Sequence, residues 1–173
     1  MAAPVGVTED VCPFCAYLTG RSLPGLVEPG LLAFRSDRAH AFPSLHQRAG
    51  NRGHHLVVPS AHTADVYRLA EGDYHGLMAA VSTVARAVRA AFGATGITIM
   101  QHNEWDGGQD VFHLHVHVVP RHAGDGFYHG DGRWPHGLEV ISLEERRVQA
   151  AAVAEHLGAA SPPHPVEVYG PSS

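Results

Sequence analysis

The chain has little cysteine and no long apolar run. Cys12 and Cys15 are its two cysteines among 173 residues, too few for a framework of disulfide bonds. No stretch approaches the roughly 20 apolar residues that a membrane-spanning helix needs. Residues 1–10 have neither the basic start nor the apolar segment of a signal peptide. The sequence therefore predicts a cytoplasmic protein without a membrane partner.

An excess of basic residues is also missing. The formal net charge is −5, so the chain lacks the positive field that nucleic-acid-binding proteins use. We expect no nucleic-acid partner, although a small nucleotide remains compatible with this charge. Histidine is abundant instead, with fifteen residues. The length suits one domain with its own hydrophobic core.

The most informative stretch is residues 112–121, which read F-H-L-H-V-H-V-V-P-R. His113, His115 and His117 alternate with apolar residues, so a β-strand here places the imidazoles on one face. Same-face neighbours lie roughly 6.5 to 7 Å apart, and two rings can therefore act on opposite sides of one small group. Three interpretations remain at this point: ordinary strand histidines, a metal site, or phosphate chemistry with an imidazole nucleophile.

Cys12 and Cys15 form a C-x-x-C pair that also has three interpretations. The thiolates could supply half of a zinc site, act as a redox pair, or be two inert small residues. A redox site of the glutaredoxin type needs a hydrophobic strand directly before the pair, and residues 4–10 do not form one. Metal binding is therefore favoured over redox chemistry, with inert thiols as the second interpretation.

Hydrophobic periodicity along the chain predicts an α+β order of elements. The expected strands are residues 31–34, 39–42, 53–59, 97–101 and 112–121. A short helical turn is expected at residues 65–69 and a long amphipathic helix from Asp73 to Phe92. A second helix should occupy residues 142–157, because Ser142 and Glu145 form a capping box. Residues 43–52 and 124–137 read as loops.

The order of these expected elements divides the chain into four segments. Residues 1–11 form an N-terminal leader, and residues 12–128 form the main domain. Residues 129–157 form a C-terminal extension with a loop and a helix. Residues 158–173 form a Pro-rich tail that we expect to be extended and partly disordered.

H-L-H-V-H-V-V-P resembles the signature of the histidine-triad (HIT) superfamily, in which three histidines alternate with apolar residues. The resemblance covers roughly residues 12–128 and is to the bacterial zinc-containing branch. Further matching stretches are residues 34–42, residues 53–62 (G-H-H-L-V-V-P-S-A-H), Asn103, Gly108-Gln109, Pro120-Arg121 and residues 124–127. It implies an α+β fold in which a five-stranded antiparallel sheet packs with the long helix and the C-terminal helix. It also implies a homodimer.

The resemblance further implies hydrolysis or transfer at the α-phosphate of a nucleotide, such as a dinucleoside polyphosphate or a nucleoside phosphoramidate. His115 is then the nucleophile that forms a nucleotidyl-histidine intermediate, and His117 hydrogen bonds the phosphate or the bridging atom. Asn103 and Gln109 resemble the polar partners of the phosphate and the leaving group. The residues expected to bind the nucleotide are Phe42, Ser44, Leu45, Asn103, Gln109, His115 and His117.

A structural zinc ion is the cofactor that the resemblance implies. Its ligands would be Cys12, Cys15, His62 and His113, a closed tetrahedron that leaves His115 for chemistry.

Two positions depart from the family pattern. Ser44 stands where many members have an aspartate toward the ribose, and Asp110 stands where one branch has a serine toward the phosphate. We assign Asp110 no phosphate contact, because a carboxylate repels phosphate. Two other functions stay open: a nucleotide-binding module without efficient catalysis, and an enzyme whose triad holds a catalytic metal.

Overall fold

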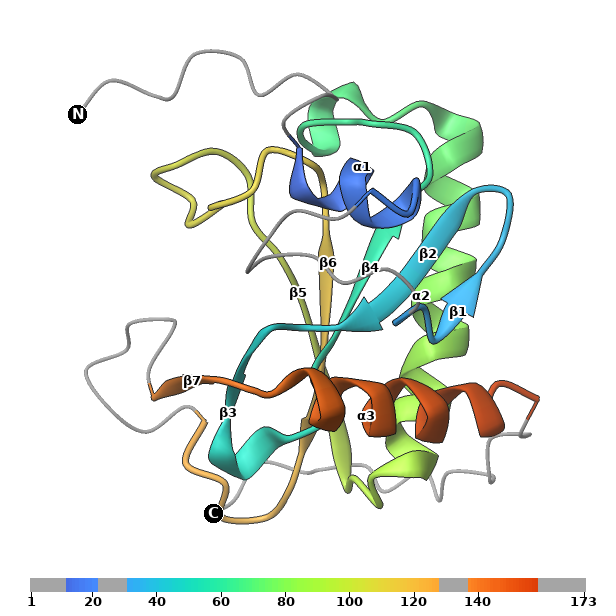
Figure 1. Cartoon of the computed structure of the whole chain (residues 1–173). Coiled ribbons are helices and arrows are strands. Elements are labelled where there is room, and N and C mark those ends of the chain that lie inside the picture. Colours follow the sequence, from blue (N-terminus) through green and yellow to red (C-terminus); the bar gives the residue numbers. More distant parts are fainter. Residues whose placement is uncertain (1–11, 22–30, 128–136, 159–173) are drawn as a thin grey trace, which may run out of the picture.

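The computed structural model describes residues 12–21, 31–127 and 137–158, which form an α+β fold (Figure 1). Its main sheet is antiparallel and has the strand order β1-β2-β4-β6-β5. The strands are β1 (Phe34–Arg35), β2 (Ala39–Pro43), β4 (His55–Pro59), β5 (Gly96–Gln101) and β6 (Val116–Arg121). The predicted fold class, a five-stranded antiparallel sheet with one long and one C-terminal helix, is confirmed.

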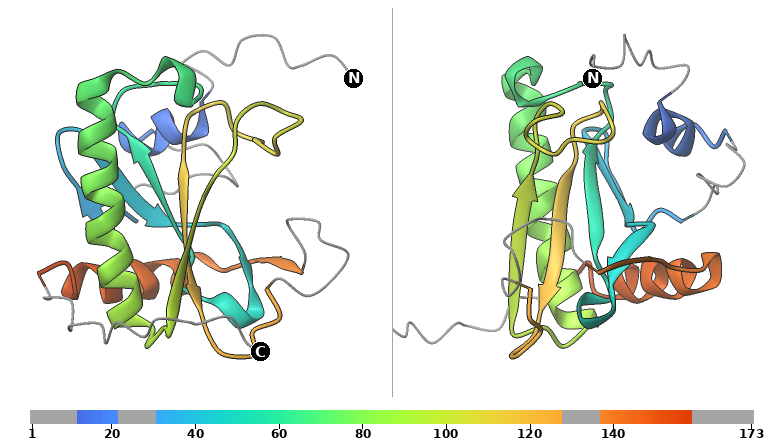
Figure 2. Two further views of the ribbon diagram at one scale, coloured as in Figure 1. Left: turned by 180° about the vertical axis from the view of Figure 1, so that it is seen from behind. Right: turned by 90° about the vertical axis from the view of Figure 1, so that its left-hand side faces the viewer.

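The long helix α2 (Glu71–Ala91) covers one face of the main sheet (Figure 2). Its buried residues recur every three or four positions, so they form one apolar stripe that packs on Val57 and Val118 of the sheet. The helix begins two residues before the predicted cap. Asp73 lies in its first turn instead and forms a 2.8 Å ion pair with Arg38. None of the described helices is both long and apolar enough to cross a membrane.

Two further described helices complete the fold. Helix α3 (Leu143–Glu155) occupies the predicted C-terminal position, and the Ser142 hydroxyl accepts a 3.1 Å hydrogen bond from the Glu145 amide. Ala150 and Val153 of α3 join the main hydrophobic core. Helix α1 (Pro13–Leu18), which was not anticipated from the sequence, lies on the side of the sheet opposite α2 (Figure 2).

A small second sheet, which was not predicted, uses three residues of the expected loop at 43–52 and three residues that follow the expected loop at 124–137. Strand β3 (His46–Arg48) pairs antiparallel with β7 (Leu138–Val140), with His46 opposite Val140. Three-residue strands carry too few positions to show a period of two, so the sequence did not reveal them. Short 3₁₀ turns form at Ala49–Asn51 and at Val66–Arg68. The second lies within residues 65–69, where a helical turn was predicted.

The histidine strand is shorter than predicted. Strand β6 begins at Val116, so His113 and His115 precede the sheet ladder. The Leu114 amide between them donates a 2.6 Å hydrogen bond to the Thr63 carbonyl, outside the main sheet. The predicted leader, most of the loop at 124–137, and nearly all of the Pro-rich tail lie outside the described residues.

His55 of β4 is a fully buried imidazole in the core. Its Nδ1–H donates a 2.8 Å hydrogen bond to the Gly53 carbonyl, and its ring lies 6.4 Å from that of Phe92. Nε2 has no hydrogen-bond partner among the described residues. Burial therefore lowers the pKa of His55 to about 4, against the smaller opposing effect of the Gly53 hydrogen bond.

The low pKa of His55 makes the fold sensitive to acid. The unfolded chain takes up this proton near the ordinary pKa of about 6.5, whereas the folded chain resists it until about pH 4. The free energy of unfolding should therefore decrease as the pH falls through this window. Between about pH 7 and about pH 4.5, His55→Leu should remove about 2 kcal/mol of that decrease. Urea unfolding at about pH 7 and about pH 4.5 measures it, and an unchanged pH dependence in the variant would contradict this account.

Candidate active site and metal centre

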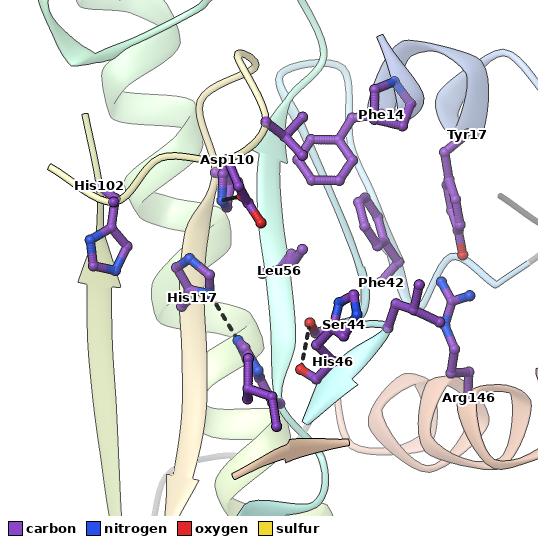
Figure 3. A pocket seen from close by; sticks show the side chains of 17 residues that line it. Phe14, Tyr17, Phe42, Ser44, His46, Leu56, His102, Asp110, His117 and Arg146 are labelled. Carbon is purple, nitrogen blue, oxygen red and sulfur yellow. Dashed lines mark hydrogen bonds and ion pairs between the residues drawn. The ribbon is translucent and has the colours of Figure 1, made fainter. Parts of the chain in front are cut away.

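A pocket of about 350 Å³ opens on the side of the sheet that carries α1 (Figure 3). It brings together the loop before β6, the strands β2 and β4, and the helices α1 and α3. The described residues that line it are Pro13, Phe14, Tyr17, Phe42, Ser44, Leu45, His46, His54, Leu56, His102, Gly108, Asp110, Val111, His115, His117, Leu138 and Arg146.

His115 presents one ring nitrogen to this pocket. Its Nδ1 lies 2.9 Å from the carbonyl oxygen of His113, and a carbonyl only accepts, so Nδ1 carries the hydrogen. Nε2 of the neutral ring therefore holds the lone pair. This atom lies 3.8 Å from Oδ1 of Asp110, which also lines the pocket.

Burial keeps the His115 ring neutral. The side chain is 3 % exposed, and desolvation lowers its pKa more than the His113 carbonyl and the Asp110 carboxylate raise it. A neutral imidazole with a lone pair on Nε2 is the form that can attack an electrophile. This geometry is compatible with the predicted nucleophile, and the role of His115 stays a prediction.

His117 lies beside His115 on the same side of the pocket, with ring centres 4.9 Å apart. Its Nδ1 is 3.0 Å from Nε2 of His54, so one ring donates and the other accepts (Figure 3). Burial and the neighbouring imidazoles hold the pKa of His117 far below its usual range. Burial lowers the pKa of His54 to about 3. Both rings are therefore neutral hydrogen-bonding groups.

The imidazoles of His54 and His102, which also line the pocket, were not predicted from the sequence. His54 lies in the G-H-H-L-V-V-P stretch, directly before β4. This position next to a strand could have identified it as a candidate site residue. His102 follows β5, and its Nδ1–H donates a 2.9 Å hydrogen bond to the Gly107 carbonyl. The ring of His102 lies edge-on to His117, with centres 5.4 Å apart. Five histidines line the described pocket: His46, and a connected group formed by the rings of His54, His102, His115 and His117.

The amides of Asn103 and Gln109 are not among the described groups that line the pocket. Gln109 is 1 % exposed. Its Nε2 donates to the Ala64 carbonyl at 2.6 Å, and its Oε1 accepts from the Glu104 amide at 2.8 Å. The Asn103 amide exchanges hydrogen bonds with the Gln101 side chain at the end of β5. Both amides therefore stabilise the chain between β5 and β6. Their predicted contacts with phosphate and leaving group stay predictions.

Phe42, Ser44 and Leu45 line the pocket, in line with the expectation for nucleotide binding. Phe42 stacks on Tyr17 with ring centres 4.3 Å apart, and this pair gives the pocket a flat apolar wall. The Ser44 hydroxyl donates a 2.9 Å hydrogen bond to the His46 carbonyl. Its hydrogen is therefore already used within the protein, although its oxygen can still accept.

Arg146 of α3 also lines the pocket, at the end opposite Asp110 and His102 (Figure 3). Its side chain is buried. No sequence pattern pointed to this residue, because its helix follows the region that carries the family motifs. A guanidinium at this end favours a ligand with acceptor oxygens.

The four predicted metal ligands meet beside the pocket. Cys12, Cys15, His62 and His113 each offer one ligand atom, and these atoms lie within 4.8 Å of one another. Nδ1 of His113 lies 3.5 Å from both sulfur atoms, and Nδ1 of His62 lies 3.3 Å from the Cys15 sulfur. A tetrahedral zinc ion sets its sulfur and nitrogen ligands about 3.5 Å apart. The cluster therefore fits such an ion.

A second hydrogen bond orients His113 for this role. Its Nε2 lies 3.1 Å from the Pro59 carbonyl. Nε2 therefore carries the hydrogen, and the lone pair on Nδ1 points to the two thiols.

Helix α1 connects the metal cluster to the pocket. Cys12 and Cys15 flank Phe14, whose ring lies 5.8 Å from that of His113 and 5.3 Å from that of His115. An ion bound to both cysteines therefore fixes the helix that forms one wall of the pocket.

A five-stranded antiparallel sheet, a long helix and a row of alternating histidines beside a pocket define a protein of the histidine-triad fold. The HIT domain family matches residues 29–124. The protein named hit of Bacillus subtilis is 32 % identical over 137 residues, which cover 76 % of this chain and 89 % of that protein. The chain therefore belongs to the HIT domain family.

Other relatives agree with this assignment. A zinc-bound histidine triad family protein of Mycobacterium smegmatis has a TM-score of 0.66 and 29 % identity, covering 88 % of this chain and 100 % of the other. The adenylylsulfatase HINT3 of Arabidopsis thaliana is 23 % identical over 149 residues, which cover 86 % of this chain and 71 % of that enzyme. The family thus includes nucleotide hydrolases among the relatives of this chain.

Proposed function

We propose that this protein is a nucleotide hydrolase or nucleotidyl transferase that acts at the α-phosphate through a covalent bond to His115. The observation that carries the proposal is the fixed tautomer of His115, which presents the Nε2 lone pair at the pocket wall. The adenylylsulfatase activity in the name of the plant relative agrees with this class of reaction.

The proposed reaction has two steps. Nε2 of His115 bonds to the α-phosphorus while the bond from phosphorus to the leaving group breaks, and the leaving group takes a proton. Water, or another acceptor in a transfer reaction, then displaces the histidine and releases the nucleotide. The His113 carbonyl accepts a hydrogen bond from the imidazolium that the first step creates. This hydrogen bond stabilises the positive charge on His115, which burial away from water otherwise disfavours.

Neighbouring groups complete the proposed site. The ring centre of His117 lies 4.9 Å from that of His115. In this proposal His117 hydrogen bonds the phosphate or the bridging atom. Phe42 and Leu45 form the apolar wall for the nucleoside, with Ser44 as an acceptor beside it. Asn103 and Gln109 support the site in this proposal by holding the chain beside His115, since both amides are engaged within the protein.

We further propose that Cys12, Cys15, His62 and His113 hold a structural zinc ion. The short spacings between sulfur and nitrogen and the orientation of His113 support it. Four protein ligands leave no open position for a substrate, so the ion would stabilise α1 and the chain at His113 rather than take part in catalysis.

Zinc analysis of two variants tests the metal proposal. The wild-type protein should contain about one zinc ion per chain, and Cys15→Ser should lose most of it, because three ligands bind zinc more weakly. His115→Asn should keep the ion, since His115 is outside the cluster. Elemental analysis by mass spectrometry provides the measurement. Loss of zinc from His115→Asn would instead support a catalytic metal held by the triad.

The covalent route is tested on His115 itself. His115→Asn should lower the turnover of dinucleoside triphosphate and nucleoside phosphoramidate by roughly a thousandfold or more, because the nucleophile is gone. The exposed His75 of α2 provides the matched control, and His75→Asn should keep full activity. Acid-quenched wild-type protein should carry a nucleotide adduct by mass spectrometry.

Two outcomes would refute the covalent proposal in different ways. Turnover that survives in His115→Asn would exclude a covalent nucleotidyl-histidine. Tight nucleotide binding by the wild-type protein without turnover of either substrate would favour the binding module, which the engaged Ser44 hydroxyl makes a specific alternative.

We also propose a homodimer that forms along β5. This strand is at an edge of the main sheet, so one row of its backbone groups has no strand partner. Exposed apolar side chains gather beside it, with Tyr74 48 %, Met78 40 % and Ile99 43 % exposed. They line an apolar hollow of about 260 Å³ between α2 and β5. A second copy that pairs through β5 would cover this surface.

A charge placed in this surface tests the dimer. Ile99→Lys should give a monomer, because dimerisation would bury an unpaired ammonium group. Val148→Lys is the control, since Val148 of α3 is 60 % exposed but lies away from β5. Light scattering coupled to gel filtration measures the mass. A dimeric Ile99→Lys variant would place the interface elsewhere.

A further inference from the structure

We propose that Asp110 selects the substrate by the charge of its leaving group. It favours leaving groups that carry a positive charge near the scissile bond, such as the second amine of a diamine, and disfavours polyphosphate leaving groups. The inference rests on the proposed function, because it assumes that His115 attacks the α-phosphorus.

The first support is the position of the carboxylate. Oδ1 of Asp110 lies 3.8 Å from Nε2 of His115, the atom that would attack. The side chain lines the pocket and is 82 % exposed, so an incoming substrate can reach it. Figure 3 shows Asp110 at the end of the pocket that also holds His102 and His117.

The second support is the distance to the reacting phosphorus. Nucleophile and phosphorus approach to about 3 to 3.5 Å before they react. Oδ1 therefore lies no further than about 7 Å from the phosphorus, given its 3.8 Å distance from Nε2. In a short diamine the second amine lies three bonds beyond the leaving nitrogen, which puts it within about 12 Å of Oδ1 even when it extends away. This is comparable with the Debye length of about 8 to 10 Å, so salt screens the charge only in part. The carboxylate therefore attracts or repels that charge directly.

The third support is the distribution of charge along the pocket. Asp110 is the one carboxylate among the described residues that line it. The guanidinium of Arg146 lies at the opposite end (Figure 3). Among the described residues that line the pocket, no lysine or arginine lies at the end with Asp110. A cation on the leaving group would supply the missing counter-charge.

Hydrogen bonds of the neighbouring residue hold the backbone of Asp110 beside His115. The neighbouring Gln109 is buried, and its amide bonds the backbone at Ala64, Glu104 and Val111. The backbone of Asp110 therefore cannot swing away from His115 without breaking these bonds. A polyphosphate chain thus meets a negative charge that the loop does not withdraw.

The reaction remains balanced with an amine leaving group. The bond between Nε2 and phosphorus forms while the bond between phosphorus and the amine nitrogen breaks. The electron pair goes to that nitrogen, which takes a proton from water and leaves as the free amine. Water then hydrolyses the adduct and restores neutral His115. The second amine of the substrate keeps its charge throughout and pairs with Asp110.

The test varies only the charge of the leaving group. Three phosphoramidates of one nucleoside monophosphate are compared, with a diamine, an alkylamine and an ω-amino acid of the same length. Dinucleoside triphosphate is the fourth substrate. The wild-type protein should prefer the diamine to the ω-amino acid compound by roughly tenfold in kcat/KM. Attraction of the amine and repulsion of the carboxylate add, and partly exposed charge pairs have effects of this size.

Asp110→Asn should remove this preference in both directions. Its kcat/KM should decrease for the diamine compound and increase for the ω-amino acid compound and the triphosphate. Asp106→Asn is the matched control, because Asp106 is exposed in the same loop but is not among the residues that line the pocket. That variant should keep the wild-type order of substrates.

The outcomes separate this inference from the proposed function. Equal decreases for all substrates in Asp110→Asn, with the order unchanged, would show a structural role and overturn the inference alone. A wild-type protein that ignores leaving-group charge would also overturn it alone. Failure of the wild-type protein to turn over any of the four compounds would refute the proposed function and this inference together.

Discussion

One hydrogen bond, from Nδ1 of His115 to the carbonyl of His113, links the two sites of this protein. The ring of His113 belongs to the Cys2His2 cluster, while its carbonyl sets the tautomer of His115. The same residue thus serves the cluster with its side chain and the pocket with its backbone. Because the chain at Leu114 leaves the strand ladder and bonds Thr63, both groups can be presented at once. A shift of His113 would disturb both sites.

Burial determines the chemistry of the pocket. Ring nitrogens that are removed from water lose the solvation that a positive charge needs, and His54, His115 and His117 all have lowered pKa values. The site is therefore built from neutral donors and acceptors, with formal charges at its two ends. Asp110 lies at the end with His115, and Arg146 lies at the end with the aromatic wall. Such a pocket distinguishes ligands by where they carry charge.

The sequence predicted the parts of this structure that repeat or alternate. The periods of α2 and of the sheet strands, and the capping box at Ser142, gave the main elements, and the motif gave the cluster of Cys12 and its partners. Other features depend on contacts between distant segments, which no local pattern encodes. The pairing of β3 with β7 and the entry of Arg146 into the pocket are of this kind. The Gln109 amide faces its own loop for the same reason.

The placement of α3 has a consequence for how this protein can change over evolutionary time. The helix follows the matched HIT region, which ends at residue 124. It nevertheless contributes Arg146 to one end of the pocket, far along the chain from the histidines. Mutations in this appended segment can alter which ligands are accepted while the reactive apparatus stays intact. Divergence among relatives can therefore proceed by exchanging C-terminal extensions on a common HIT domain.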